Sequence, residues 1–394
     1  MNSFADRYLK QQAHSKPFLT ENPPSDLFLI VVIPAYNEPN LLSCINSLAA
    51  CYKCSCSVEV LIVINESEGT SNEVITQNQT SLDELRDWKK EHPDASFTLH
   101  IIHPAPFKHK FRGVGSARKI GMDEAIYRYH TINQPDGIII SLDADTLVEK
   151  NYFLAIESFF LATPDCIGCT INFKHRISEL ENSLQQEGMR IYEQYLHYYK
   201  QALEFTGYPH AIYTIGSAFA FRAHAYVKQG GMPRRQAGED FYFLHKLTNM
   251  GSLSELNSTC VYPSARTSNR VPFGTGPGIQ KWLDGDKSLS MSYSLKAFID
   301  LRNFFATIPT LYVSKNQPLL APSILNFLTE ENFWENILPE IRANSGSLNS
   351  FEKRFFQYFN AFKVIKFLNY SHPKPYQFSP IDLLSKELNE LKLE

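Results

Sequence analysis

Two aspartates, Asp143 and Asp145, stand one residue apart just after a short apolar run over 137–142. A run of this kind, rich in β-branched residues, predicts a buried strand that ends at the two carboxylates. In open α/β sheets, ligands bind at the C-terminal ends of the strands. Carboxylate oxygens also bind hard divalent cations, which in turn hold substrate phosphates. The spacing therefore indicates a metal–diphosphate site, although acids after a strand can also simply cap the next helix.

An alternation of strands and helices in the first 150 residues would position these aspartates. Apolar runs predict strands over 27–33, 58–64, 97–103 and 137–142, and helical spacing predicts helices over 40–51, 81–91 and 115–130. Ser81, with Glu84 three residues later, is expected to cap the second of these helices. The alternation predicts a parallel, doubly wound sheet. Three loops should then meet at one edge, near 34–36, 65–66 and 143–145.

The second half of the chain is richer in helices and aromatic residues. We expect a strand over 166–175, a long Tyr-rich helix over 179–205, a strand pair over 212–221, a helix over 238–250, a loop over 261–278 and mostly helix beyond 281. No linker separates a second independent domain. We therefore predict a lead-in over 1–26, one α/β domain over 27–285, and a helical, aromatic-rich extension over 286–394 packed on the same domain.

Composition excludes several classes of protein. The 394 residues are 43% hydrophobic and 20% charged, which is typical of a globular chain. A net charge of -3 argues against nucleic-acid binding. We expect a cytoplasmic protein without a signal peptide or transmembrane segment, and peripheral membrane contact stays open. The seven cysteines are expected to be reduced thiols, since the C-x-x-C pair Cys51 and Cys54 lacks a second ligand pair for zinc.

Four motifs, in order, resemble those of the family 2 glycosyltransferases, enzymes with the GT-A fold. They lie at 31–38, 113–121, 142–146, and 230–232 followed by 238–240. Four ordered motifs are far more specific than one. The resemblance implies a Rossmann-like, mainly parallel sheet flanked by helices, with a helical C-terminal extension. It also implies transfer of a hexose from a nucleotide-sugar, a UDP- or GDP-sugar, to a glycan, lipid-linked or small-molecule acceptor.

The resemblance assigns roles to particular residues. Asp143 and Asp145 would hold Mg²⁺ or Mn²⁺ against the charge of the leaving diphosphate. Asp240 would take the proton of the acceptor hydroxyl in an inverting transfer, and Glu239 would bind that hydroxyl or be the base itself. The helix dipole is expected to keep Asp240 ionised. Contacts to the donor would come from Pro34, Ala35, Tyr36, Glu38, Asn65, Glu66, Arg118, Asp143 and Arg270.

The sequence departs from the family pattern in several places, including Lys119 where the family usually has Asn. Asn65 and Glu66 replace the paired aspartates after the second strand, and no third metal ligand is evident between 260 and 281. In the loop over 266–276, Arg270 and the turn at 274–276 are expected to close over the diphosphate, because guanidinium and backbone N–H groups suit phosphate oxygens. An ordinary glycine-rich surface loop is the open alternative.

Two other functions stay open. A sugar-nucleotide nucleotidyltransferase should have a glycine-rich basic loop after the first strand, whereas the loop at 34–38 is acidic and lacks glycine. A non-catalytic module that binds a nucleotide-sugar or glycan would not need the four acids Asp143, Asp145, Glu239 and Asp240. Retention at the anomeric carbon is also an open alternative to inversion.

Overall fold

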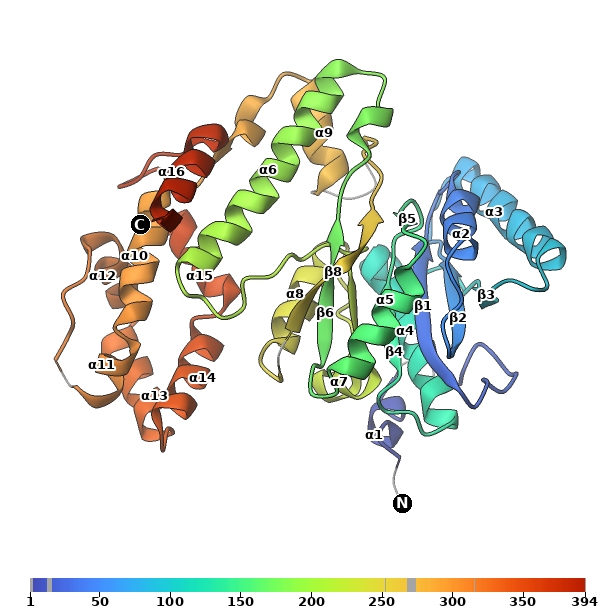
Figure 1. Cartoon of the computed structure of the whole chain (residues 1–394), viewed down its shortest axis with the longest axis horizontal. Coiled ribbons are helices and arrows are strands. Elements are labelled where there is room, and N and C mark those ends of the chain that lie inside the picture. The colour runs from blue at the N-terminus through green and yellow to red at the C-terminus, as the bar shows by residue number, and fades with distance from the viewer. Residues whose placement is uncertain (1–2, 13–15, 252, 268–273, 315, 394) are drawn as a thin grey trace. The chain divides into compact units, whose positions relative to one another are not determined.

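The computed structural model describes residues 3–12, 16–251, 253–267, 274–314 and 316–393. The described chain falls into two compact units (Figure 1), the first made of Met1–Arg176 and Thr214–Gly274, the second of Ile177–Tyr213 and Thr275–Glu394. This division differs from the predicted ranges mainly because Ile177–Tyr213, which contains the Tyr-rich helix, groups with the C-terminal residues. The predicted domain boundaries at 27–285 and 286–394 stay a prediction.

Within its described residues, the first unit contains a mixed eight-stranded sheet in the order β3-β2-β1-β4-β7-β6-β8-β5. Its strands are β1 Leu27–Ala35, β2 Ser57–Ile64, β3 Thr98–Ile102, β4 Ile138–Ser141, β5 Leu147–Val148, β6 Gly168–Phe173, β7 Phe219–Arg222 and β8 Leu253–Tyr262. Strands β3, β2, β1 and β4 are parallel, as are β6 and β8, whereas β7 and β5 run antiparallel to their neighbours. The predicted fold class, an α/β GT-A-type sheet flanked by helices with a helical C-terminal region, is confirmed.

The central strand β1 shows why the apolar runs predicted the sheet correctly. Eight of its nine residues are buried, as expected for a strand covered on both faces. Helix α4 (Val114–Thr131) packs on β1 and β2. Gly121 permits this approach, because a Cβ atom there would lie 2.4 Å from Cγ1 of Val32. The other helices of this unit are α1 Asp6–Leu9, α2 Leu41–Ala49, α3 Asn72–Glu91, α5 Tyr152–Ala162, α7 Ala223–Gln229 and α8 Glu239–Leu247, with the 3₁₀ turn η1 His109–Phe111.

Several predicted elements differ from the structure. Helix α3 begins nine residues before the predicted start, so Ser81 is not its N-cap; Ser81 is buried inside the helix and donates a hydrogen bond to the backbone oxygen of Glu38. The predicted strand pair over 212–221 is one strand, β7. Strand β8 was not predicted, because its polar residues break the apolar pattern. Helix α9 begins inside the predicted loop over 261–278.

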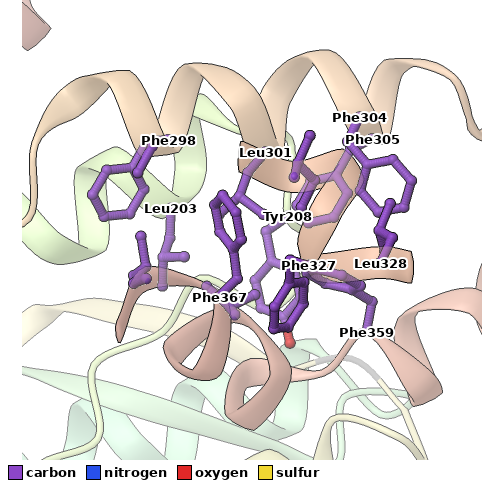
Figure 2. Close-up of a cluster of buried hydrophobic side chains, with 14 of the residues drawn as sticks. Leu203, Tyr208, Phe298, Leu301, Phe304, Phe305, Phe327, Leu328, Phe359 and Phe367 are labelled. Atoms are coloured by element: carbon purple, nitrogen blue, oxygen red, sulfur yellow. The ribbon is translucent and has the colours of Figure 1, made fainter. Parts of the chain in front are cut away.

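The second unit is mainly helical. Its elements are η2 Ile177–Glu179, α6 Ser183–Phe205, α9 Thr275–Leu283, η3 Lys287–Ser290, β9 Met291–Ser292, α10 Leu295–Ala306, α11 Ile308–Val313, α12 Pro322–Glu330, the π-helix η4 Phe333–Ile337, α13 Leu338–Ala343, α14 Leu348–Tyr358, α15 Ala361–Tyr370, β10 Ser379–Pro380 and α16 Ile381–Leu393. Figure 2 shows how Phe298 and Phe304 on α10 pack with Phe327 and Phe367 in one hydrophobic core. The aromatic richness of the C-terminal region therefore serves packing. Among the described residues, no helix is both long and apolar enough to cross a bilayer.

Candidate active site

The candidate site lies at the C-terminal edge of β1, β2 and β4. Because these strands are parallel neighbours, the loops that follow them emerge at one edge. The backbone N–H of Asn65, after β2, donates to the oxygen of Ala35 at 3.0 Å. The edge carries these residues from the predicted set: Pro34, Ala35, Tyr36 and Glu38 after or at the end of β1, Asn65 and Glu66 after β2, and Asp143 and Asp145 after β4. Arg270 lies outside the described residues.

Asn78, a buried residue of α3, ties two of these loops together. Its Oδ1 accepts from the backbone N–H of Asn37 at 2.9 Å, and its Nδ2 donates to the backbone oxygen of Asn65 at 3.2 Å. The same amide also lies 3.3 Å from a carboxylate oxygen of Glu66. Sequence reasoning missed Asn78 because it falls in the polar half of α3, which was not predicted as helix. Its contacts hold the loops predicted to bind the nucleotide.

Arg118 connects the aspartates after β4 to helix α8. Its guanidinium group forms ion pairs with the carboxylates of Asp143 and Glu239. The arginine is only 2% exposed, and Glu239 is equally buried. Within the described part of the chain, Oε2 of Glu239 has no hydrogen-bond partner. A buried arginine thus brings two acids from distant parts of the sequence into one polar cluster.

Two glycines explain how α4 places Arg118 in this cluster. Gly113 precedes the helix with φ 116°, a conformation that favours glycine. At Gly115 a Cβ atom would lie 2.4 Å from the backbone oxygen of Arg235, in the segment that leads into α8. The first turn of α4 can therefore lie directly against this segment. Gly113 and Gly115 of the 113–121 motif thus serve the approach of α4 to the segment before α8.

Asp240 follows Glu239 in the first turn of α8, and its Oδ1 accepts from the backbone N–H of Phe241 at 2.7 Å. Burial and the neighbouring charge of Glu239 raise the pKa of Asp240 to about 7, although Arg118 opposes this shift. Burial also raises the pKa of Glu239, again against the effect of Arg118. The helix dipole was expected to keep Asp240 ionised, but desolvation and the second acid outweigh the dipole and raise the pKa of this carboxyl.

Arg266 forms a second bridge between acids. Its Nη1 donates to Oε1 of Glu38 at 2.9 Å, and its Nη2 donates to Oδ2 of Asp145 at 3.0 Å and to Oε2 of Glu38. Glu38 is 2% exposed, and Arg266 compensates its buried charge. Arg266 was not among the predicted site residues. Its position in the Arg-rich loop after β8 was the available signal, but nothing in the sequence indicated which acids it would contact.

The two aspartates fit a hard divalent cation. Their side chains are partly exposed, 36% for Asp143 and 25% for Asp145, and both present carboxylate oxygens. In the ranges that the structure describes, no cluster of three or more His, Cys, Asp or Glu ligand atoms includes them. Magnesium tolerates so few protein ligands, because phosphate and water complete its shell. A cation here must compete with the guanidinium groups of Arg118 and Arg266.

A comparison with protein families decides the class of the chain. The model of glycosyl transferase family 2 matches residues 30–229, just over half of the sequence. The chain belongs to glycosyl transferase family 2. The matched region runs from β1 through α7 and includes Arg118, Asp143 and Asp145. Membership of family 2 supports glycosyl transfer as the chemistry of this site.

Solved structures of glycosyltransferases resemble the chain at low sequence identity. S. aureus TarS 1-349 in complex with UDP-GlcNAc is 13% identical, with a TM-score of 0.42 over 87% of this chain and 90% of that chain. The mannosyltransferase PcManGT from Pyrobaculum calidifontis, in complex with GDP-Man and Mn²⁺, is 15% identical, with a TM-score of 0.40 over 90% of this chain and 92% of that chain. No curated protein matches the sequence.

Proposed function

We propose that this family 2 enzyme transfers a hexose from a UDP- or GDP-sugar to a hydroxyl group of a glycan, lipid-linked or small-molecule acceptor. The observation that carries the proposal is the bridge formed by Arg118. It places Asp143, at the end that suits a donor diphosphate, in the same cluster as Glu239 and its neighbour Asp240. A glycosyl transfer needs both a site for the leaving diphosphate and a base for the acceptor.

The proposed reaction inverts the anomeric carbon. The acceptor hydroxyl gives its proton to the carboxylate of Asp240 while its oxygen forms a bond to the anomeric carbon. On the opposite face, the bond between that carbon and the diphosphate oxygen breaks, and the nucleoside diphosphate leaves with the electron pair. Glu239, held by Arg118, binds or orients the acceptor hydroxyl. With a pKa of about 7, Asp240 is close to the range in which a carboxylate is an effective general base near neutral pH.

Mg²⁺ or Mn²⁺ held by Asp143 and Asp145 would neutralise the charge of the leaving diphosphate. The chain's own residues provide the remaining donor contacts in this proposal. The loop at 34–38, with Asn65 and Glu66, binds the base and ribose, and the hydrogen bonds of Asn78 keep these loops in place. The predicted closure over the phosphates by Arg270 and the turn at 274–276 stays a prediction, because Arg270 lies outside the described residues and α9 begins at Thr275.

A thermal-shift screen of the full chain tests the donor site. UDP-, GDP- and dTDP-sugars are each added with and without Mn²⁺. One donor should raise the melting temperature, and only with metal; ligand at 100 times its Kd stabilises a protein by about 2.7 kcal/mol. Asp145→Asn should abolish the shift. Asp83→Asn, which changes an exposed acid on α3, is the matched control and should retain it.

Transfer itself is then measured with the stabilising donor and a panel of acceptors. Nucleoside diphosphate release that depends on Asp145 and Asp240 supports the proposal. Full transfer by Asp145→Asn contradicts the proposed metal site. Release of pyrophosphate from a nucleoside triphosphate and a sugar phosphate would instead identify a nucleotidyltransferase, and donor binding without any turnover would identify a binding module.

A further inference from the structure

A cluster of metal-ligating side chains lies outside the candidate active site, in the loop between α2 and β2. Cys54 and Cys56 are separated by one residue in this loop, and their Sγ atoms are 3.5 Å apart. Glu157, on α5, reaches the same loop and is 5% exposed. One ligand atom from each of the three residues lies within 4.8 Å of the other two. In the described part of the chain, this is the only cluster of its kind.

We propose that Cys54, Cys56 and Glu157 bind a zinc ion. Zinc accepts thiolate and carboxylate ligands in tetrahedral geometry, and two sulfurs on one zinc at about 2.3 Å lie about 3.8 Å apart. The observed Sγ–Sγ distance is close to that value. Two sulfurs with one oxygen also suit zinc better than Mg²⁺ or Ca²⁺, which prefer oxygen ligands alone. Water or a further group fills the fourth position.

The surroundings of the three side chains hold them in place. One oxygen of Glu157 accepts from the backbone N–H groups of Ser55 at 3.1 Å and Cys56 at 3.0 Å. These hydrogen bonds orient the carboxylate toward the loop, as outer-shell contacts orient metal ligands. Cys54 and Cys56 are both partly exposed, which leaves a path for an ion to enter.

Cys51 does not belong to this cluster, although the sequence pairs it with Cys54 in a C-x-x-C pattern. It is buried, and its thiol donates to the backbone oxygens of Ser47 and Glu149 at 3.5 and 3.4 Å. The ligand set is therefore C-x-C plus a glutamate from α5. This is why counting closely spaced cysteine pairs in the sequence could not find it.

The zinc site has a structural role, because it lies far from the donor site. The cysteines precede the first residue of β2, Ser57, whereas Asn65 follows its last residue. Eight residues of strand span roughly 25 Å. An ion at the cysteines therefore cannot contact the donor. It instead links the loop before β2 to α5, and its binding energy adds to the stability of this unit.

The full chain is first freed of metal with a chelator. Its binding of zinc then tests the proposal. One zinc ion should bind per chain in a competition with a chromophoric chelator, and Co²⁺ should give a sulfur-to-cobalt charge-transfer band. Replacing both cysteines, Cys54→Ser with Cys56→Ser, should abolish the band, and Glu157→Gln should weaken zinc binding by more than about tenfold. Cys51→Ala should leave both unchanged. Asp145→Asn should also retain zinc, which separates this site from the proposed donor metal.

Several results would overturn the zinc site. These are the absence of a sulfur-to-cobalt band in the reduced wild-type protein, zinc retained by the double cysteine variant, or zinc lost on Asp145→Asn. A Cys54–Cys56 disulfide that forms in air, with no metal uptake after reduction, would replace the proposal with a redox pair. If the double variant fails to fold, the cobalt spectrum of the wild type and the zinc affinity of Glu157→Gln still test the site.

Discussion

At the scale of single residues, the two acids at the start of α8 have different surroundings. The carboxylate of Glu239 is engaged by the guanidinium of Arg118. The carboxylate of Asp240 accepts a hydrogen bond from the next backbone N–H group, that of Phe241. A carboxylate held by a buried arginine is a weaker base in that position, because the ion pair favours its charged form. Asp240 is therefore the better candidate for the base, and Glu239 for orientation of the acceptor.

The raised pKa of Asp240 predicts a pH-dependent stability. In the unfolded chain an aspartate loses its proton near pH 4, whereas in the folded protein Asp240 keeps its proton up to about pH 7. Ionisation of Asp240 therefore weakens the folded state progressively as the pH rises from about 4 to 7. Asp240→Asn cannot ionise, so it should be more stable than the wild type at pH 8, by on the order of 1 to 4 kcal/mol.

Thermal unfolding at pH 8 and pH 4.5 measures this difference. The advantage of Asp240→Asn should shrink toward zero at the lower pH, while glycosyl transfer by the variant at pH 8 should fall by about 10² to 10⁴. A variant that is less stable than the wild type at both pH values would contradict the raised pKa, whatever its activity.

The ion pair between Arg266 and Asp145 predicts that this arginine competes with the metal. Its guanidinium is bound to Asp145 and Glu38, so a cation must displace it from Asp145. Arg266→Gln should therefore bind Mn²⁺ about tenfold more tightly in the absence of donor, a change of about 1.4 kcal/mol. Electron paramagnetic resonance of free Mn²⁺ measures the affinity. Arg86→Gln, which removes an exposed arginine paired with Asp83, should change nothing. Unchanged Mn²⁺ affinity combined with weaker binding of nucleoside diphosphate would show that Arg266 serves the phosphates alone.

At the scale of secondary-structure elements, the sequence predicted the buried apolar strands but not the elements that carry many polar residues. Strands β1, β2 and β4 are buried apolar runs, and the loops after them were located correctly. The first half of α3 and most of β8 carry polar residues, so periodicity gave no signal there. Partners far apart in sequence, such as Glu38 and Arg266, which are 228 positions apart, could not be predicted without the fold. The predicted motifs included Arg118, Asp143 and Glu239, but they did not indicate that the arginine joins the two acids.

The contact between α4 and the segment before α8 depends on Gly115, which has no side chain. Gly115→Ala would place its Cβ atom 2.4 Å from a backbone oxygen, so the two elements must separate. Overpacking of this kind costs typically about 1 to 3 kcal/mol. Because Arg118 and Glu239 lie on these elements, transfer should fall more than stability alone explains. Gly346→Ala is the control, since a Cβ atom there would meet no atom within 4 Å. Equal activity of the two variants at a temperature where both are folded would refute this role of the contact.

At the scale of the whole molecule, each unit has a core of its own. The core formed by Phe298, Phe304, Phe327 and their neighbours draws all its members from Ile177–Tyr213 and Thr275–Glu394. The sheet of the first unit carries the proposed donor site. Two separate cores can unfold separately, in which case a ligand of one unit protects that unit alone. Calorimetry should therefore show two unfolding transitions, and donor with Mn²⁺ should raise the midpoint temperature of only one of them.

A core substitution identifies the other transition. Phe304 is fully buried and contacts the rings of Phe333, Phe355 and Phe359, so Phe304→Ala should cost about 3 to 5 kcal/mol. Phe304→Ala should lower the midpoint temperature of the transition that the donor leaves unchanged. Leu319→Ala, at a fully exposed position, should lower neither midpoint temperature. A single transition that responds both to donor and to Phe304→Ala would instead mean that the chain unfolds as one cooperative domain. That result would favour the extension over 286–394 as a part of the catalytic domain, since one cooperative transition is the usual behaviour of a single domain.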